Sequence, residues 1–420
     1  MPYQDPFALP GDSAPSLPPN PNSSSSTTTT LPPEHLDAAA TTLNQLTTQA
    51  GQNPAGHGTA QLHTAANAER SHSLFRSVFP YTSVEEFEAE WHLGNYIMDR
   101  ATGAKTFEPM SLYVRLGMHL LYYGSPQQQA LHTHRAQALL REQSLKMGQE
   151  YDAPASRAHI QPFIDSFGLQ ETLKEMVEPD PTKYQTFNAF FARQIRDSTR
   201  PQASPGDPSV VTSPADCRLT CFPSIDLATR FWIKGFGFTL PRLLNSTPLA
   251  EKFVGGNIVI ARLAPQDYHR WHAPVSGTVE SVTEIPGAYY TVNPQAVCQA
   301  GTLDVFCENR RSVMVIRRSG SGTLVVVVAV GAMLVGSIKY NPGVVVGAEV
   351  KRGQCLGAFY YGGSTVIVLY PKGEIALDAD LVRNSCESRC ETLVKVGWRV
   401  GAGPAGFARV PSIALRLLSA

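Results

Sequence analysis

Two histidines stand apart from the other histidines of this 420-residue chain. His269 and His272 lie in the stretch Asp267-Tyr-His-Arg-Trp-His-Ala-Pro274, and no other histidine follows His159. We expect this stretch to be a loop or turn between two strands, where functional groups concentrate. The pair can serve as acid and base, as metal ligands or as structural groups. A metal would need further ligands, for which the sequence offers only Asp267 or Asp216.

A serine that follows two glycines is the second candidate. Gly362-Gly363-Ser364-Thr365 separates an aromatic run from a β-branched run. Read as a pattern, it is a glycine turn that joins two strands. It also permits chemistry, because a serine hydroxyl can attack the carbonyl of its own preceding peptide bond, and glycine tolerates the strained backbone. Such an attack needs a base that is oriented by a carboxylate. The chain offers Asp216, the two histidines and Ser364, in that order.

Short strands are predicted to hold these residues. After Pro201, β-branched runs alternate with Gly, Pro and Asp turns, which is typical of a β-rich domain. The sequence therefore predicts an α+β protein, with a β-rich domain over residues 201–420. The predicted strands are 257–263, 278–283, 312–317, 323–330, 344–350 and 366–369.

A helical region is predicted before the strands, over residues 75–200. Its segments 84–91, 111–123, 127–147 and 187–196 have helical patterns, and the last has aromatic residues on one face and basic residues on the other. The simplest interpretation of that last segment is an amphipathic packing helix. His119, His132 and His134 also fall in this region and are expected to be ordinary surface or core histidines.

Composition excludes some classes of protein. Lys plus Arg and Asp plus Glu are both 35, so we expect no strongly basic nucleic-acid binder. Seven cysteines without paired metal spacing indicate free thiols in a reducing compartment. The first 69 residues contain no Lys or Arg and are rich in Pro, Ser and Thr, so residues 1–70 are expected to be a disordered polar tail.

No targeting or membrane-spanning segment is predicted. The acidic, arginine-free start is unlike a mitochondrial presequence, and it has no apolar core of a secretory signal. The most apolar run, 324–338, is short and interrupted by glycines, so it reads as two buried strands rather than a transmembrane helix. We expect a cytoplasmic or peripheral membrane protein.

The candidate residues stand in motifs that resemble phosphatidylserine decarboxylase proenzymes. These motifs occur in the family's order, and the resemblance covers about residues 180–375. Residues 107–124 are similar to the extended fungal members. The quoted motifs are Phe187-Asn-Ala-Phe-Phe-Ala-Arg193, Ser213-Pro-Ala-Asp216, Trp232-Ile-Lys-Gly235, Leu263-Ala-Pro-Gln-Asp-Tyr-His-Arg-Trp-His-Ala-Pro274, Val330-Gly-Ala-Met-Leu-Val-Gly-Ser-Ile338 and Gly363-Ser-Thr365.

The resemblance implies a self-processing carboxy-lyase. Ser364 would attack the Gly363 carbonyl, and the chain would part between the two residues into a β chain (1–363) and an α chain (364–420). Residue 364 would then become a pyruvoyl cofactor, so neither pyridoxal phosphate nor a metal is expected. Asp216 and His272 would activate Ser364, and His269 would serve decarboxylation. Lys339 is expected to be an ordinary strand-end residue.

Phospholipid biosynthesis is the process that the resemblance implies, with phosphatidylserine converted to phosphatidylethanolamine and carbon dioxide. Contact with a membrane surface and a homodimer would accompany this. Three residues depart from the family pattern and would alter the pocket: Cys217, Gly362 and Met333.

Two other readings remain open. One is a family member that acts on a free amino acid, such as tryptophan, in fungal secondary metabolism. The other is a non-catalytic module, because residues 275–279 and 347–357 are similar to the paired hairpins of biotinyl/lipoyl domains. A carrier of that kind needs a modifiable lysine at a hairpin tip, and no such motif is present.

Overall fold

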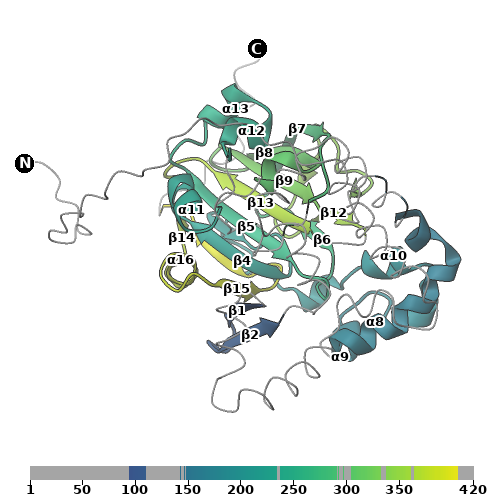
Figure 1. Cartoon of the computed structure of the whole chain (residues 1–420). Coiled ribbons are helices and arrows are strands. Elements are labelled where there is room, and N and C mark those ends of the chain that lie inside the picture. The colour runs from purple at the N-terminus through teal and green to yellow at the C-terminus, as the bar shows by residue number, and fades with distance from the viewer. Residues whose placement is uncertain are drawn as a thin grey trace, which may run out of the picture.

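The computed structural model describes residues 94–109, 148–233, 237–290, 304–332, 337–360 and 364–404, together with the single positions 142, 146, 292 and 297. These residues form large sheets with short helices around them (Figure 1). The expected α+β class is confirmed. The polar tail 1–70, the predicted helices 84–91 and 111–123, almost all of 127–147, and the histidines His119, His132 and His134 lie outside the described residues.

The central element is a ten-stranded sheet in the order β11-β7-β8-β9-β13-β5-β4-β15-β1-β2. All its neighbouring pairs are antiparallel except β1 with β15. In chain order the bounds are β1 Gly94–Asp99, β2 Lys105–Pro109, β4 Cys217–Phe222, β5 Asn257–Leu263, β7 Gly277–Ile285, β8 Arg311–Arg318, β9 Leu324–Gly331, β11 Glu349–Val350, β13 Ser364–Tyr370 and β15 Glu391–Val394.

Two three-stranded sheets accompany it. One has the order β10-β12-β6 and the other β14-β16-β3. The first matters most for the site, because β6 follows directly on the loop that begins after β5. The bounds are β3 Val210–Thr212, β6 Arg270–His272, β10 Ile338–Tyr340, β12 Cys355–Phe359, β14 Ala376–Leu377 and β16 Arg399–Ala402.

Short helices gather at two places. Helices α11, α12, α13 and α16 lie close to the large sheet, while α8, α9 and α10 form a group beyond β6 (Figure 1). The bounds are α8 Ile160–Phe167, α9 Gln170–Leu173, α10 Phe187–Phe191, α11 Ile225–Phe231, α12 Leu240–Leu244, α13 Thr247–Glu251, α15 Val305–Glu308 and α16 Ala379–Cys386, with 3-10 turns at Pro154–His159, Pro181–Lys183 and Asp197–Thr199. None of the helices within the described ranges has the length and apolarity to cross a bilayer.

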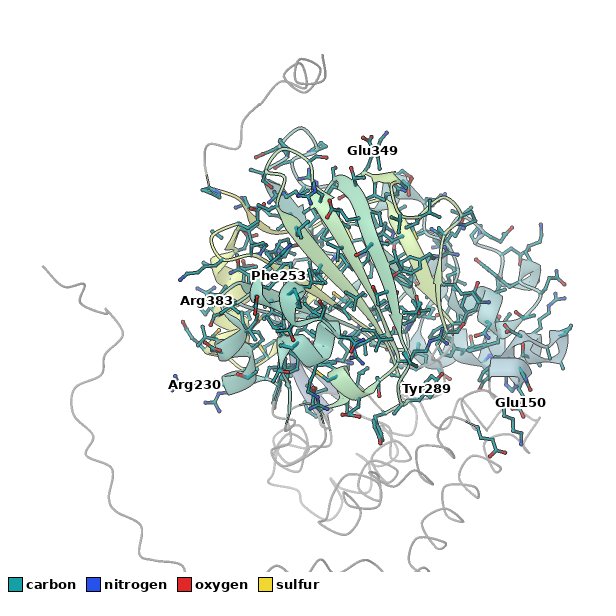
Figure 2. All side chains as sticks on the ribbon, turned by 90° about the horizontal axis from the view of Figure 1, so that it is seen from above. Glu150, Arg230, Phe253, Tyr289, Glu349 and Arg383 are labelled. Atoms are coloured by element: carbon teal, nitrogen blue, oxygen red, sulfur yellow. The ribbon has the colours of Figure 1, made fainter. Side chains whose placement is uncertain are left out.

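Both faces of the large sheet are buried. Alternate residues of β9 point to opposite sides, as strand geometry requires. Val326 and Val328 pack with Leu243 and Phe306 of the helices, whereas Val327 packs with residues of the small β6 sheet. This double burial explains the continuous apolar run in the sequence. Side chains cover both sides of the strands when the sheet is viewed from above (Figure 2).

Most predicted strands are confirmed. Strand 257–263 has the predicted bounds, and β7, β8, β9 and β13 contain the predicted 278–283, 312–317, most of 323–330, and 366–369. Of the apolar run 324–338, the first half forms the buried strand β9 as predicted, whereas only Ile338 at its end belongs to a second strand, β10, and residues 333–336 lie outside the described residues. The prediction for 344–350 was too long, because only Glu349–Val350 pairs and the preceding residues form turns.

Two helical predictions differ from the structure. Residues 94–109, expected to be helical, form the β1–β2 hairpin, which pairs with β15 at the end of the large sheet. These residues lay inside the broad region expected to be helical but outside each segment that has a helical pattern. Helix α10 stops at Phe191 rather than continuing to residue 196. The division into domains at residue 200 and the biotinyl/lipoyl-like character of the hairpins stay predictions.

A third apolar cluster joins the helical group to the loop before β6. Phe187, Phe190 and Phe191 of α10 are fully buried with Tyr268. The side chain of Thr186 accepts the Ala189 N–H and begins this helix. The aromatic face that the sequence predicted is therefore a packing face, and it lies against the histidine loop.

Strand β13 should be the least replaceable part of the sheet. Ile367 is fully buried at its middle, so Ile367→Ala should lower the free energy of unfolding by about 2–5 kcal/mol in urea titrations. Glu349 lies exposed on the edge strand, and Glu349→Ala should change it by less than about 0.5 kcal/mol. Equal losses in the two variants would contradict the central position of β13.

Candidate active site

Ser364 begins strand β13 in the interior of the large sheet. It pairs with Leu263 of β5 on one side and with Gly331 of β9 on the other, and it is 0% exposed. The two glycines before it, Gly362 and Gly363, lie outside the described residues. The hydroxyl group is thus fixed in position and shielded from solvent.

The loop after β5 begins with a closed turn. The Asp267 N–H donates to the Ala264 carbonyl at 2.9 Å, and the Ala264 N–H donates to the Asp267 carboxylate at 2.7 Å. Backbone and side chain therefore close the same four residues from both ends. This turn fixes the direction in which the chain enters the histidine motif.

His269 connects this turn to Ser364. Its Nε2 lies 3.0 Å from the Ala264 carbonyl oxygen, and its Nδ1 lies 3.0 Å from the Ser364 Oγ. A carbonyl can only accept a hydrogen bond, so Nε2 carries the proton in the neutral ring. The Nδ1 lone pair then faces the Ser364 hydroxyl. The arrangement therefore suits Nδ1 to accept a proton from Ser364.

Apolar surroundings keep His269 neutral. The ring is fully buried and stacks on Phe191, with the ring centroids 3.9 Å apart. Burial lowers the pKa of His269 to about 3, because the charged imidazolium would lose its hydration. A neutral imidazole with a defined tautomer is the form that acts as a base.

His272 has a different environment. Its Nε2 lies 2.6 Å from the Tyr268 hydroxyl, and its buried Nδ1 finds no hydrogen-bond partner among the described residues. Burial lowers the pKa of His272 to about 4, although the charge of Asp216 opposes this shift. Asp216 is thus close enough to act electrostatically on His272, but no hydrogen bond joins the two in the described structure.

Asp216 is held by Arg200. The Arg200 guanidinium donates to both carboxylate oxygens at 2.6–3.0 Å, and the Val396 N–H donates to one of them at 2.8 Å. Such a bidentate pair fixes the orientation of the carboxylate. Arg200 was not predicted from the sequence, because nothing in the pattern links it to Asp216.

The structure thus brings only some of the predicted residues into contact. Ser364 and His269 touch, while His272 and Asp216 lie nearby with other hydrogen-bond partners. Tyr268 was also missed as a partner, although it stands inside the quoted motif. The roles predicted for the four residues remain predictions.

The positions that depart from the family pattern are described only in part. Cys217 is fully buried, with its Sγ 3.8 Å from the Ser213 Oγ, and burial raises the pKa of its thiol. Met333 and Gly362 lie outside the described residues. Lys339 lies on β10, and its Nζ is 4.3 Å from the ring centroid of Tyr360. In the part of the chain that the structure describes, no three His, Cys, Asp or Glu residues are grouped to hold a metal.

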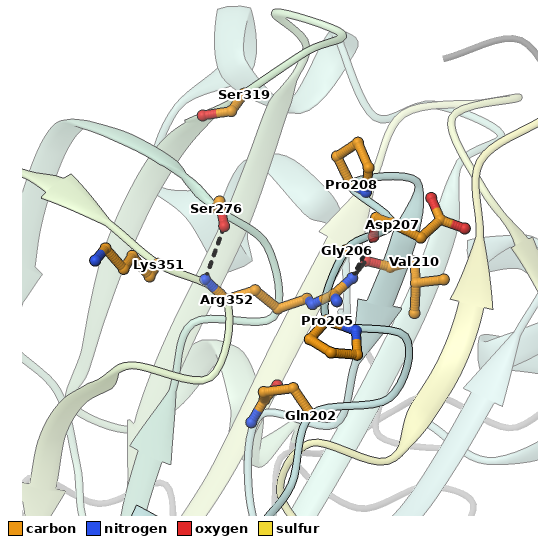
Figure 3. A pocket seen from close by; sticks show the side chains of 10 residues that line it. All are labelled: Gln202, Pro205, Gly206, Asp207, Pro208, Val210, Ser276, Ser319, Lys351 and Arg352. Carbon is orange, nitrogen blue, oxygen red and sulfur yellow. Dashed lines mark hydrogen bonds between the residues drawn. The ribbon is translucent and has the colours of Figure 1, made fainter. Parts of the chain in front are cut away.

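A cavity of about 500 Å³ lies elsewhere, between the segment 202–210 and the loop at Lys351 and Arg352 (Figure 3). The Arg352 guanidinium is not free to bind a ligand there, because it donates to the carbonyls of Ala203, Ser204, Asp207 and Val210. None of the four candidate residues lines this cavity. We therefore attribute the arrangement to packing of that segment.

Comparison with known proteins agrees with the motifs. The family model described as phosphatidylserine decarboxylase matches residues 187–402. Proenzyme 3 of Schizosaccharomyces pombe is 44% identical over 305 residues, which are 73% of this chain and 30% of that protein. Proenzyme 2 of Oryza sativa subsp. japonica is 41% identical over 305 residues, covering 73% of this chain and 48% of that protein.

A bacterial relative is matched over most of its own length. The phosphatidylserine decarboxylase proenzyme of Fusobacterium nucleatum is 31% identical over 290 residues, which are 68% of this chain and 90% of that protein. By contrast, the chain spans only about a third of the length of the fungal relatives that it matches.

Buried neutral histidines should make stability depend on pH. The pKa of each is lowered from 6.5, so the unfolded chain binds protons between about pH 4 and 6.5 that the folded chain does not bind. The contribution of these histidines to the free energy of unfolding is therefore fully present above this window, and it is lost as the pH drops through the window. Each histidine should contribute a loss of about 2 kcal/mol between pH 7 and pH 5.

Urea unfolding at these two pH values checks this in a Ser364→Ala background, which should keep the chain in one piece. His269→Gln should remove about half of the combined loss, since one of two such groups is gone. An unchanged pH dependence in His269→Gln would show that this histidine is not buried in neutral form.

Proposed function

The chain belongs to the phosphatidylserine decarboxylase family, and we propose that it is a self-processing decarboxylase that converts phosphatidylserine to phosphatidylethanolamine. The names of its relatives refer to phosphatidylserine and to a proenzyme. They lend no support to the free amino acid or the non-catalytic module as alternatives. The observation that carries the proposal is the buried contact between Ser364 and His269.

Cleavage is the first proposed step. The Ser364 Oγ attacks the carbonyl carbon of Gly363, its proton passes to a base, and the peptide nitrogen leaves with a proton to give an ester. A base then removes the Cα proton of residue 364, the Cβ–Oγ bond breaks and Gly363 leaves as a carboxylate. The dehydroalanine that remains at residue 364 is converted by water to a pyruvoyl group with loss of ammonia. The 420-residue chain becomes pieces of 363 and 57 residues.

Asp216 and His272 are our proposed pair for this step. The family resemblance assigns them to it, and the Asp216 charge raises the pKa of His272 against the effect of burial. The Arg200 contacts fix the carboxylate, and the Tyr268 hydroxyl fixes one ring nitrogen. The contact geometry favours a second candidate for the same base, His269, whose Nδ1 faces the Ser364 hydroxyl.

The residues around position 364 fit a pyruvoyl group. Strand β13 is paired on both sides at this residue, so the new chain end would stay in the sheet. The group supplies an electron sink for the electron pair left when carbon dioxide departs. His269 would take up or deliver a proton at Nδ1 beside this group, and the buried surroundings would exclude water.

Self-cleavage has a direct test. The purified wild-type chain should run on a denaturing gel as two pieces, whereas Ser364→Ala should remain one band because no attacking hydroxyl is present. Mass spectrometry should locate the cut between Gly363 and Ser364. A folded wild-type chain that stays intact would refute the proposal.

The histidines should separate the two steps. We expect His272→Ala and Asp216→Ala to stay uncut, and His269→Ala to be cut but to release at least about 100-fold less carbon dioxide, in line with the usual effect of losing an acid–base group. Release is measured from phosphatidylserine in detergent micelles, with free tryptophan as the comparison substrate. Release from tryptophan alone would refute the phospholipid assignment.

An uncut His269→Ala protein would instead assign the first proton transfer to His269, as the contact geometry favours. In that case His272→Ala should still be cut. The two outcomes are distinguished on the same gel, with Ser364→Ala as the uncut standard.

A further inference from the structure

Glu108 of the β1–β2 hairpin lies near the catalytic loop, although about 160 residues separate it from His269 in the sequence. The hairpin lies before the segment 187–402 that matches the family model. It is nevertheless joined to the large sheet through β15. This position raises the question of what Glu108 does there.

Two arginines explain why a carboxylate is needed at this end of the sheet. Arg218 of β4 and Arg262 of β5 are direct cross-strand partners, and both are largely buried. Like charges opposite each other on a sheet repel. Glu108 accepts hydrogen bonds from both arginines, and Glu391 accepts from Arg262 alone. Burial favours the neutral form of Glu108, but the two arginines outweigh it and lower the pKa of this carboxyl to about 2.

Glu108 also reaches the turn in front of the histidine motif by two routes. Its Oε1 accepts directly from the Gln266 side-chain amide at 2.8 Å. The second route runs through Arg218, whose Nη1–H donates to the Asp267 carboxylate. That carboxylate in turn accepts the Ala264 N–H. The turn is therefore attached to the hairpin at two adjacent residues.

The same turn supplies the acceptor that fixes His269. The Ala264 carbonyl receives both the Asp267 N–H and the His269 Nε2–H. A shift of Ala264 would therefore move the ring, and with it the distance from Nδ1 to the Ser364 Oγ. Catalytic geometry is sensitive to such shifts, since a displacement of about 1 Å can cost on the order of 100-fold in rate.

We propose that Glu108 is a positioning residue for the reaction: the β1–β2 hairpin clamps the Ala264–Asp267 turn through Gln266 and Arg218, and thereby holds His269 at residue 364. This inference rests on the proposed function. The hairpin is then a working part of the catalytic unit as well as an added edge of the sheet.

Glu391 provides a matched control. Like Glu108 it pairs with Arg262, although Glu391 is fully buried whereas Glu108 is partly exposed, and its loss leaves the same buried arginine with one carboxylate fewer. Among the described residues, its side chain makes no hydrogen bond or ion pair with the Ala264–Asp267 turn. A role limited to charge compensation would make Glu108→Gln and Glu391→Gln equivalent, whereas positioning of His269 would make them differ.

The experiment compares these two variants with the wild-type chain and with His269→Ala. Self-cleavage on a gel reports folding, and kcat and KM for carbon dioxide release from phosphatidylserine micelles report positioning. Glu108→Gln should be cut, with kcat lowered about ten-fold or more and KM unchanged. Glu391→Gln should be cut and keep kcat within about two-fold of the wild type, at a similar loss of unfolding free energy.

Equal kcat values in Glu108→Gln and Glu391→Gln would overturn the inference. The inference would also be overturned if Glu108→Gln slowed a step that still proceeds normally in His269→Ala. A wild-type chain that is neither cut nor active would instead refute the proposed function, and the two failures are therefore distinguishable.

Gln266→Leu guards against misfolding of Glu108→Gln. Gln266 is half-buried, and its replacement removes the direct bond to Glu108 without leaving a buried charge unpaired. We expect it to be cut normally with kcat about three-fold lower, a smaller fall than in Glu108→Gln because the route through Arg218 and Asp267 remains. If Glu108→Gln is not cut, full kcat in Gln266→Leu overturns the inference.

Discussion

The register of β13 against β5 is the constraint on which the site depends. Ser364 pairs with Leu263, the last residue of β5. The turn that starts at the next residue, Ala264, therefore begins beside the serine. The histidine loop leaves the sheet at the same level at which the serine enters it. A shift of the strands by one residue would turn the Ser364 side chain to the other face. The sheet therefore sets the distance between His269 and Ser364, and the loop only refines it.

Burial then sets the chemistry of the groups that the sheet brings together. An interior of low dielectric constant disfavours isolated charge, so both histidines are neutral while the carboxylates are paired with arginines. Neutral imidazole and ionised carboxylate coexist within the same loop for this reason. That arrangement requires a set of buried ion pairs, whose partners come from distant parts of the chain.

Because of those distant partners, the catalytic unit includes residues outside the segment that matches the family model. The family model begins at residue 187, yet the β1–β2 hairpin extends the sheet and Glu108 contributes to its ionic cluster. The helical group contributes as well, because Phe191 stacks on His269 and Arg200 holds Asp216. Glu108 and Arg200, which lie outside the quoted motifs, thus complete the environment of the residues within them.

The sequence by itself determined the strands and the reactive residue types. Alternation and β-branched runs predicted β5, β7, β8, β9 and β13, because each strand has a local period that does not depend on its partner. The motifs singled out Ser364 and the two histidines for the same reason, since they are short and contiguous. What the sequence did not determine was contact across long separations. The pairing of residues 94–109 with β15 and the partners of Asp216 arise from tertiary packing across long sequence separations, which has no local signal. The choice of His269 rather than His272 as the neighbour of Ser364 was likewise decided only in three dimensions, by the strand register and by the Ala264 carbonyl that holds the ring.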